Sequence, residues 1–129
     1  MSHLDSLNEQ QRIAATHTSG PLLVVAGAGT GKTKTIVHRI LNLVQTGIDP
    51  RSILAITFTN KAATEMRERV HGMLSQNDGL PTVCTFHSLG VRILREHSSL
   101  IGLNKYFTIL DSQDSGSLIK QAMKELDID

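Results

Sequence analysis

Ala26-Gly27-Ala28-Gly29-Thr30-Gly31-Lys32-Thr33 is the stretch that decides how the rest of this chain can fold. It follows an apolar run at residues 22–25 and precedes a stretch with the apolar spacing of a helix. The glycines let the backbone curl until successive N–H groups point into one concavity, where they can bind phosphate oxygens at the start of the next helix. The stretch therefore predicts a phosphate-binding loop between a strand and a helix.

The order of strand, glycine-rich loop and helix is typical of nucleoside triphosphatases. The strict form of the pattern begins with glycine, whereas Ala26 holds that position here. In this pattern Lys32 reaches the β- and γ-phosphates and the Thr33 hydroxyl binds Mg²⁺, so we predict both as catalytic residues, Thr33 as the metal ligand and all eight residues as nucleotide-binding. The alternative is a glycine-rich turn that carries a surface lysine.

The composition limits which classes of protein are possible. The 129 residues suffice for one domain of ordinary size, with 40% hydrophobic and 19% charged residues. Only 3% are aromatic, so the core must be aliphatic. A net charge of +1 means that any nucleic-acid surface must be local. The single cysteine, Cys84, excludes an internal disulfide framework and suits a reducing cytoplasm; we expect it to be buried. No long apolar stretch appears, so we expect no membrane segment.

Apolar spacing predicts strands that alternate with helices. The strands are expected at residues 22–25, 53–58 and 82–85, and the helices at 7–15, from the loop to about 45, at 59–74, at 86–94 and from 111 almost to the end. Asn8 with Gln11, and Asp111 with Asp114, mark helix starts. The alternation indicates a parallel sheet with right-handed crossovers. Because three strands would leave apolar edges uncovered, we expect the front part of a larger protein.

Polar clusters fall at the end of each predicted strand, at 27–33, 57–61 and 85–88. The carboxyl ends of parallel strands meet at one edge of a sheet, where ligands bind. The predicted strands therefore place two further loops beside the phosphate site.

The second and third loops have the chemistry of a single-stranded nucleic-acid surface. Phe58 could stack on a base, while Thr59 and Asn60 offer hydrogen bonds to phosphate or sugar. The third loop repeats the design with Thr85, Phe86, His87 and Ser88. Other interpretations stay open: Phe58 could pack in the core, the polar pair could cap a helix, and His87 could be an exposed or backbone-bonded histidine.

Together these motifs resemble the opening motifs of the UvrD/Rep-like superfamily 1 DNA helicases. The resemblance runs from about Leu7 to Leu94, in the order and spacing of that family. It rests on four segments: Leu7-Asn8 with Gln11-Arg12, the glycine-rich loop, Thr57-Phe58-Thr59-Asn60-Lys61-Ala62-Ala63 with Glu65-Met66, and Thr85-Phe86-His87. The third segment is much more specific than the glycine-rich loop alone.

The resemblance implies an α/β P-loop NTPase of the RecA-like kind, a parallel sheet flanked by helices that is incomplete in this chain. It implies a helicase that binds ATP and Mg²⁺ and moves along single-stranded DNA, typically 3′ to 5′. Gln11 would read the adenine edge, and Lys34 stands where many relatives carry an arginine near the nucleotide. The DNA-contacting positions of the family correspond here to Phe58, Thr59, Asn60, Thr85 and His87.

The resemblance also implies what the chain lacks. The acidic Asp-Glu motif and the second motor half with its arginine finger do not occur, so the fragment alone should be inactive or nearly so. Residues 1–99 would form the first part of the motor domain and 100–129 the start of a helical insertion. Partners would be single-stranded DNA, duplex junctions and the rest of the helicase. A non-motor P-loop regulatory module and a small-molecule P-loop kinase are the alternatives.

Overall fold

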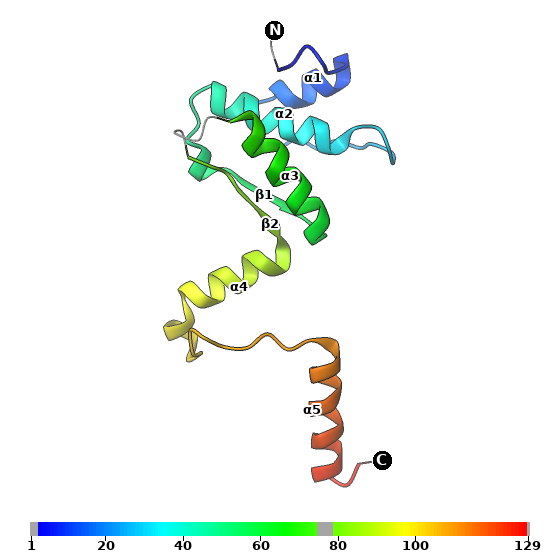
Figure 1. Ribbon diagram of the computed structural model, residues 1–129, viewed down its shortest axis with the longest axis vertical. Helices are drawn as coiled ribbons and strands as arrows, with labels where there is room; N and C mark the ends of the chain where they lie inside the picture. The colour runs from blue at the N-terminus through cyan, green and yellow to red at the C-terminus, as the bar shows by residue number, and fades with distance from the viewer. Residues whose placement is uncertain (1–2, 75–78, 129) are drawn as a thin grey trace. The chain divides into compact units, whose positions relative to one another are not determined.

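The computed structural model describes residues 3–74 and 79–128 of an α/β chain. The chain divides into two compact units, Met1–Leu89 and Gly90–Asp129. Figure 1 follows the elements along the chain. The first unit contains α1 (Glu9–Thr16), α2 (Lys32–Gln45), the short 3-10 helix η1 (Pro50–Ser52), β1 (Leu54–Thr57), α3 (Asn60–Met73) and β2 (Thr82–Thr85). Helix α4 (Phe86–Glu96) spans the boundary, and the second unit continues with η3 (Ser98–Ile101) and α5 (Ser112–Glu125).

Helix α1 begins with the capping box that the sequence predicts. The Asn8 side chain accepts a hydrogen bond from the Gln11 N–H, and the Gln11 side chain accepts one from the Asn8 N–H. At its other end, Arg39 of α2 donates to the Ala14 carbonyl at 2.9 Å and also to the His17 carbonyl. These bonds satisfy carbonyls that the end of a helix leaves unpaired. The two helices are therefore joined by polar contacts as well as by packing.

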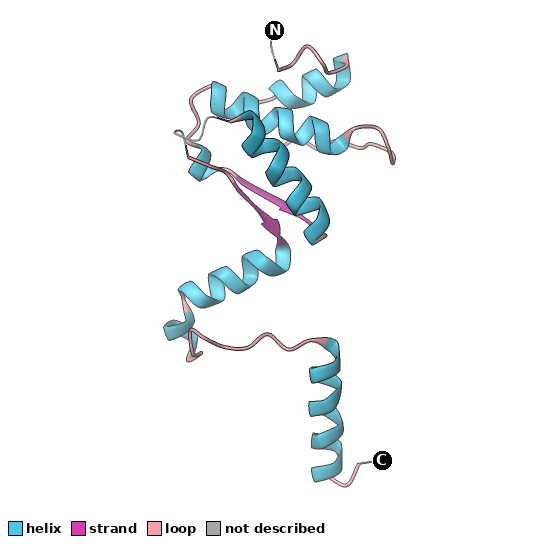
Figure 2. Cartoon of the chain, viewed as in Figure 1, coloured by secondary structure: helices cyan, strands magenta, loops and turns pink. Residues whose placement is uncertain are grey.

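The described residues contain one sheet, in which β1 and β2 run parallel with Leu54 opposite Thr82 and Thr57 opposite Thr85. Figure 2 shows the two strands in magenta beside the helices. Burial alternates along both strands, so Ala55 and Val83 lie on the covered side. The core is aliphatic, as the composition predicts, and is formed by α2, α3 and the sheet through Val37, Ile40, Leu41, Ala55, Met66, Val70 and Val83.

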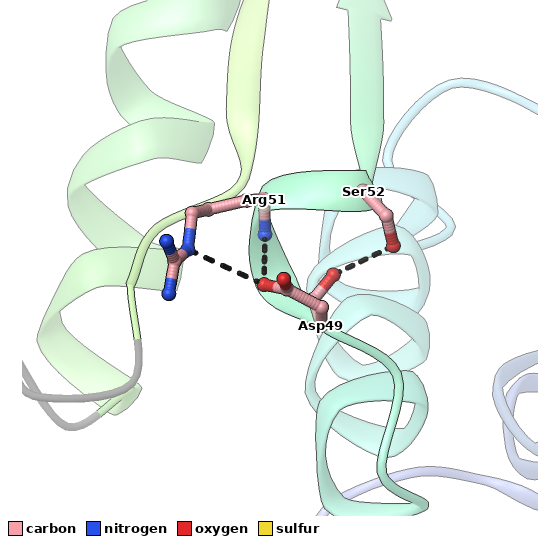
Figure 3. Close-up of polar contacts among 3 residues, drawn as sticks. All are labelled: Asp49, Arg51 and Ser52. Carbon is pink, nitrogen blue, oxygen red and sulfur yellow. Dashed lines mark hydrogen bonds and ion pairs between the residues drawn. The ribbon is translucent and has the colours of Figure 1, made fainter.

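The turn that leads into β1 is closed by its own polar groups, as Figure 3 shows. The Asp49 carboxylate accepts a hydrogen bond from the Arg51 N–H at 2.9 Å, and the Ser52 hydroxyl donates to the Asp49 carbonyl at 2.7 Å. The Arg51 guanidinium lies 3.6 Å from the same carboxylate, but both side chains are exposed, so this ion pair adds little stability. The hydrogen bonds fix the entry to the strand.

The prediction of a strand at residues 22–25 is wrong. This segment has no regular secondary structure, and its Leu23 and Val25 side chains are 87% and 90% exposed. A strand needs a neighbour to bond its N–H and C=O groups, and within the described ranges β1 and β2 bond only to each other. The sheet of this chain therefore has two described strands where three are expected. The expectation that Cys84 is buried is also wrong, because its exposure is intermediate.

The second unit is held by local contacts. Asp111 caps α5 and forms a capping box with Asp114, as predicted. The Arg95 guanidinium lies 5.5 Å from the centre of the Phe107 ring. The two units divide after Leu89, earlier than the boundary at residue 100 that we expected. The start of a helical insertion at residue 100 stays a prediction. In residues 3–74 and 79–128, every helix is too short or too polar to cross a membrane.

Candidate nucleotide and nucleic-acid site

The glycine-rich loop, residues 26–31, leads directly into α2, as predicted. Gly29 and Gly31 have φ angles of 75° and 85°, which side-chain-bearing residues rarely adopt, and Gly31 is the N-cap of α2. No side chain caps this helix, and its first turn carries no acidic residue. The free N–H groups, the helix dipole and the neighbouring lysines therefore favour an anion at this position.

Lys32 already lies against the loop. Its ammonium donates to the Ala26 carbonyl at 3.1 Å and to the Gly27 carbonyl at 2.8 Å. The Thr30 hydroxyl donates to the same Gly27 carbonyl at 2.7 Å, which holds the turn. A phosphate on the loop would therefore meet the ammonium at once, and the lysine would exchange carbonyl acceptors for anionic ones.

Thr33 follows in the first turn of α2 and is half-buried. Among the hydrogen bonds of the described residues, none involves its hydroxyl group. A hydroxyl oxygen is a ligand that Mg²⁺ accepts, and this ion usually keeps several waters and binds phosphate oxygens as well. The described residues hold no cluster of three or more His, Cys, Asp or Glu side chains suited to a metal. The Thr33 hydroxyl therefore stays a predicted ligand of Mg²⁺.

A cavity of about 420 Å³ lies beside the loop. Its polar wall includes Gln11, Thr30 and Lys32, and its apolar wall includes Leu22 and Ile36. The volume is within the range of small-molecule pockets. The structure thus brings the predicted adenine reader, Gln11, to the same cavity as the loop.

Gln11 and Lys34 differ in what they contact. The Gln11 side chain donates from Nε2 to the Thr30 carbonyl at 3.0 Å, which joins α1 to the loop. The Lys34 ammonium instead donates to the Ser6 carbonyl ahead of α1. In this state Lys34 supports the packing of α1 on α2, and its contact with a nucleotide stays a prediction.

Phe58 lies beyond the end of β1 and is 89% exposed, so the interpretation as a core residue is wrong. Thr59 is the N-cap of α3, since its hydroxyl accepts from the Ala62 N–H at 3.1 Å. Asn60 is the first residue of that helix and is exposed. The second loop therefore presents an open aromatic ring beside the start of a helix.

The third loop supplies a second ring. Phe86 follows β2 and is 55% exposed, and its ring centre lies 5.5 Å from that of Phe58 with the planes tilted by 50°. The sequence predicts Phe86 in the third loop beside Thr85 and His87, although it is not among the residues that we predicted to contact DNA. Its contact with Phe58 depends on the pairing of β1 with β2.

The polar residues of the third loop have different environments. Thr85 is only 5% exposed, and its hydroxyl is hydrogen-bonded to the Ser88 hydroxyl at 2.9 Å and accepts from the Ser88 N–H at 3.2 Å. His87 is exposed. The buried Thr85 therefore supports the loop through its hydrogen bonds to Ser88, while His87 is accessible at the surface of the loop.

Comparison with known proteins shows the family of this chain. Residues 7–129 match the family model of the UvrD/REP helicase N-terminal domain. The ATP-dependent DNA helicase PcrA of Leuconostoc citreum is 49% identical over 127 residues, which are 97% of this chain and 17% of that protein. The ATP-dependent DNA helicase UvrD1 of Mycobacterium bovis is 51% identical over 128 residues, which are 98% of this chain and 17% of that protein. PcrA of Staphylococcus aureus is 46% identical over 127 residues, which are 98% of this chain and 17% of that protein.

The chain spans about 17% of the length of the curated relatives that it matches. The match nevertheless covers nearly all of this chain, including the glycine-rich loop and both strand ends. The chain belongs to the UvrD/REP helicase N-terminal domain family.

Proposed function

We propose that this chain is the nucleotide-binding and DNA-gripping part of an ATP-dependent DNA helicase with a P-loop, RecA-like fold. The observation that carries the proposal is the contact of Lys32 with a glycine-rich loop at the uncapped start of α2, in a chain of the UvrD/REP family. The names of the relatives, ATP-dependent DNA helicases, support the same activity.

ATP binds with its phosphates on the loop. Lys32 contacts the β- and γ-phosphates, Thr33 holds Mg²⁺, and Gln11 contacts the adenine; the full set of nucleotide-binding residues is Gln11, Ala26, Gly27, Ala28, Gly29, Thr30, Gly31, Lys32, Thr33 and Lys34. Mg²⁺ held by Thr33 would supply positive charge that offsets the charge developing on the phosphates. The loop and α2 contribute the fixed N–H donors that position those oxygens.

Single-stranded DNA lies across the strand ends. Phe58, with Phe86 beside it, stacks on bases, and Thr59, Asn60 and His87 bond to the backbone of the strand. Thr85 belongs to the proposed DNA site because its hydrogen bond to Ser88 supports the loop that carries His87. Such a surface needs no large net charge, which agrees with the value of +1.

Hydrolysis and movement belong to the whole protein. Closing of the two motor halves on ATP shifts the grip on DNA, and hydrolysis releases it, with translocation 3′ to 5′ and unwinding at duplex junctions. The acidic motif and the arginine finger that hydrolysis requires are not in this sequence, so this chain alone turns over ATP slowly or not at all. The cytoplasm is the proposed compartment, supported by the single cysteine.

The test is ATP hydrolysis by the full-length protein that carries these residues, with and without an unstructured single-stranded oligonucleotide. We expect the oligonucleotide to stimulate hydrolysis, and Lys32→Ala to abolish the activity. A wild-type protein that binds ATP but shows no response to DNA would overturn the proposal and favour a nucleotide-binding regulatory module. Stimulated hydrolysis by the isolated chain would contradict the assignment of hydrolysis to the missing parts.

A further inference from the structure

Helix α3 lies beside both strands of the sheet (Figure 1) and is joined to β2 by a polar side chain as well as by core packing. The Arg67 guanidinium donates from Nη2 to the Val83 carbonyl of β2 at 2.8 Å, in a bond that is partly shielded from solvent. Val83 itself is only 4% exposed, so without the guanidinium its carbonyl would have little access to water. The strand therefore has no ready replacement for this bond.

The bond lies on the edge of β2 that faces away from β1. The Thr82 N–H donates to the Ile53 carbonyl, just ahead of β1. The polar groups of successive residues in a strand point to alternate sides, so those of Val83 point to the opposite edge. Within the described ranges β2 pairs with β1 alone. The strand is thus held from both edges, by β1 on one and by Arg67 of α3 on the other.

Arg67 and Val83 belong to the two segments that carry the aromatic rings. Helix α3 begins directly after Phe58, with Thr59 as its N-cap, and β2 leads to Phe86. Helix α4, which starts at Phe86, has no buried residue, so this helix contributes little to holding the ring. The position of Phe86 therefore depends on the strand ahead of it.

We infer that Arg67 is a positioning residue for the proposed DNA site: by holding β2 against α3, it keeps the centre of the Phe86 ring 5.5 Å from that of Phe58. The inference rests on the proposed function, since it assumes that the two rings stack on the bases of single-stranded DNA. Arg67 acts here through the strand and not through its charge, because its guanidinium bonds to a protein carbonyl. An arginine that bound a phosphate instead would contribute to the salt dependence of the affinity, so the two roles can be separated.

The experiment measures the Kd of the full-length protein for an oligothymidylate by fluorescence anisotropy over a series of salt concentrations. The variant is Arg67→Met, which removes the hydrogen-bond donors and keeps an unbranched apolar stem. The matched control is Arg69→Met, which removes the same charge from the same helix, where the guanidinium has no hydrogen-bond or ion-pair partner among residues 3–74 and 79–128. We expect the Kd to rise about fivefold in Arg67→Met, a population shift equivalent to one lost hydrogen bond, and to stay near the wild-type value in Arg69→Met.

The decisive measurement repeats the Arg67 change in a Phe86→Ala background. If Arg67 acts through this ring, Arg67→Met should cause no further loss of affinity there, and its salt dependence should equal that of the parent protein. A loss of the same size in both backgrounds would overturn the inference, because Arg67 would then support the fold in general. A slope of log Kd against log salt reduced by about one would overturn it too, because Arg67 would then bind a phosphate. An unchanged Kd in Arg67→Met would also overturn it.

Two further measurements separate this inference from the function on which it rests. A wild-type protein that does not bind the oligothymidylate would refute the proposed function itself. The Mg·ATP affinity should be the same in all variants, because the described hydrogen bonds of the glycine-rich loop involve neither Arg67 nor β2. If Arg67→Met loses Mg·ATP binding and so fails to fold, Arg67→Lys takes its place. Its ammonium keeps the charge and a flexible donor, so we expect a smaller rise in Kd, again absent in the Phe86→Ala background.

Discussion

Replacing Phe58 with alanine separates a role in DNA binding from a role in folding. The ring is 89% exposed, so only about a tenth of the ~1.5–3 kcal/mol available from full burial of a phenylalanine is realised here. The contact with Phe86, at 5.5 Å between ring centres, contributes at most ~0.5–1.5 kcal/mol. We therefore expect Phe58→Ala to lower the free energy of unfolding by about 1 kcal/mol or less in a urea titration.

The same substitution should have a larger effect on the binding of single-stranded DNA. A lost stack on one base costs ~1–3 kcal/mol, so the Kd for an oligothymidylate should rise about 5- to 150-fold. Fluorescence anisotropy at a fixed salt concentration measures this change, because salt alone shifts such affinities. Tyr106→Ala is the matched control, since that ring is 85% exposed but lies in the second unit.

Two results would refute this reasoning. One is an unchanged Kd for Phe58→Ala in the salt-controlled titration. The other is a loss of unfolding free energy above about 2 kcal/mol, a value typical of a buried side chain. The double variant with Phe86→Ala adds a further check, because two rings that form one platform should give non-additive losses of DNA affinity.

Other perturbations address the loop, the helix packing and α4. Lys32→Ala should greatly weaken Mg·ATP binding and leave the Kd for single-stranded DNA unchanged; a loss of both in parallel titrations would indicate misfolding. Burial lowers the pKa of His38 from the usual 6.5, and electrostatic interactions with the nearby His3 and Lys34 side chains lower it further. The unfolded chain therefore binds a proton more readily, so this contribution to stability is complete above pH 6.5 and is lost as the pH falls toward the folded pKa. Unfolding titrations at about pH 7.5 and about pH 5.5 should show a smaller pH effect for His38→Leu, and an equal effect would contradict the assignment. Gly90→Ala should raise stability by ~0.5–1 kcal/mol, because a Cβ there meets no atom within 4 Å in a helix; a lower melting temperature would show that α4 needs this glycine.

Features fixed by short-range bonds could be predicted from the sequence. The Asn8 and Gln11 pair lies three residues apart, so the capping box follows from the pattern alone. The strands predicted at residues 53–58 and 82–85 correspond to β1 and β2, because their apolar runs end at clear polar breaks. The order of helices from α1 to α5 follows in the same way.

Features that depend on distant neighbours could not be predicted in this way. Residues 22–25 have the composition of a buried strand, but a strand forms only where another one supplies its hydrogen bonds. Thr85 lies at the end of a strand, where ligand-binding residues are common, yet it is buried and its hydroxyl is hydrogen-bonded to that of Ser88. The Phe58 and Phe86 pair lies far apart in sequence, so only the pairing of β1 with β2 shows that the rings meet.

The register of the two strands also determines which changes in chain length the proposed DNA site can tolerate. Thr57 and Thr85 are opposite each other, so each strand delivers its next residue, Phe58 or Phe86, at the same level. Arg67 of α3 donates to the Val83 carbonyl of β2 at 2.8 Å, so α3 also holds β2 in this register. A residue deleted inside either strand would turn its remaining side chains to the opposite face and separate the rings.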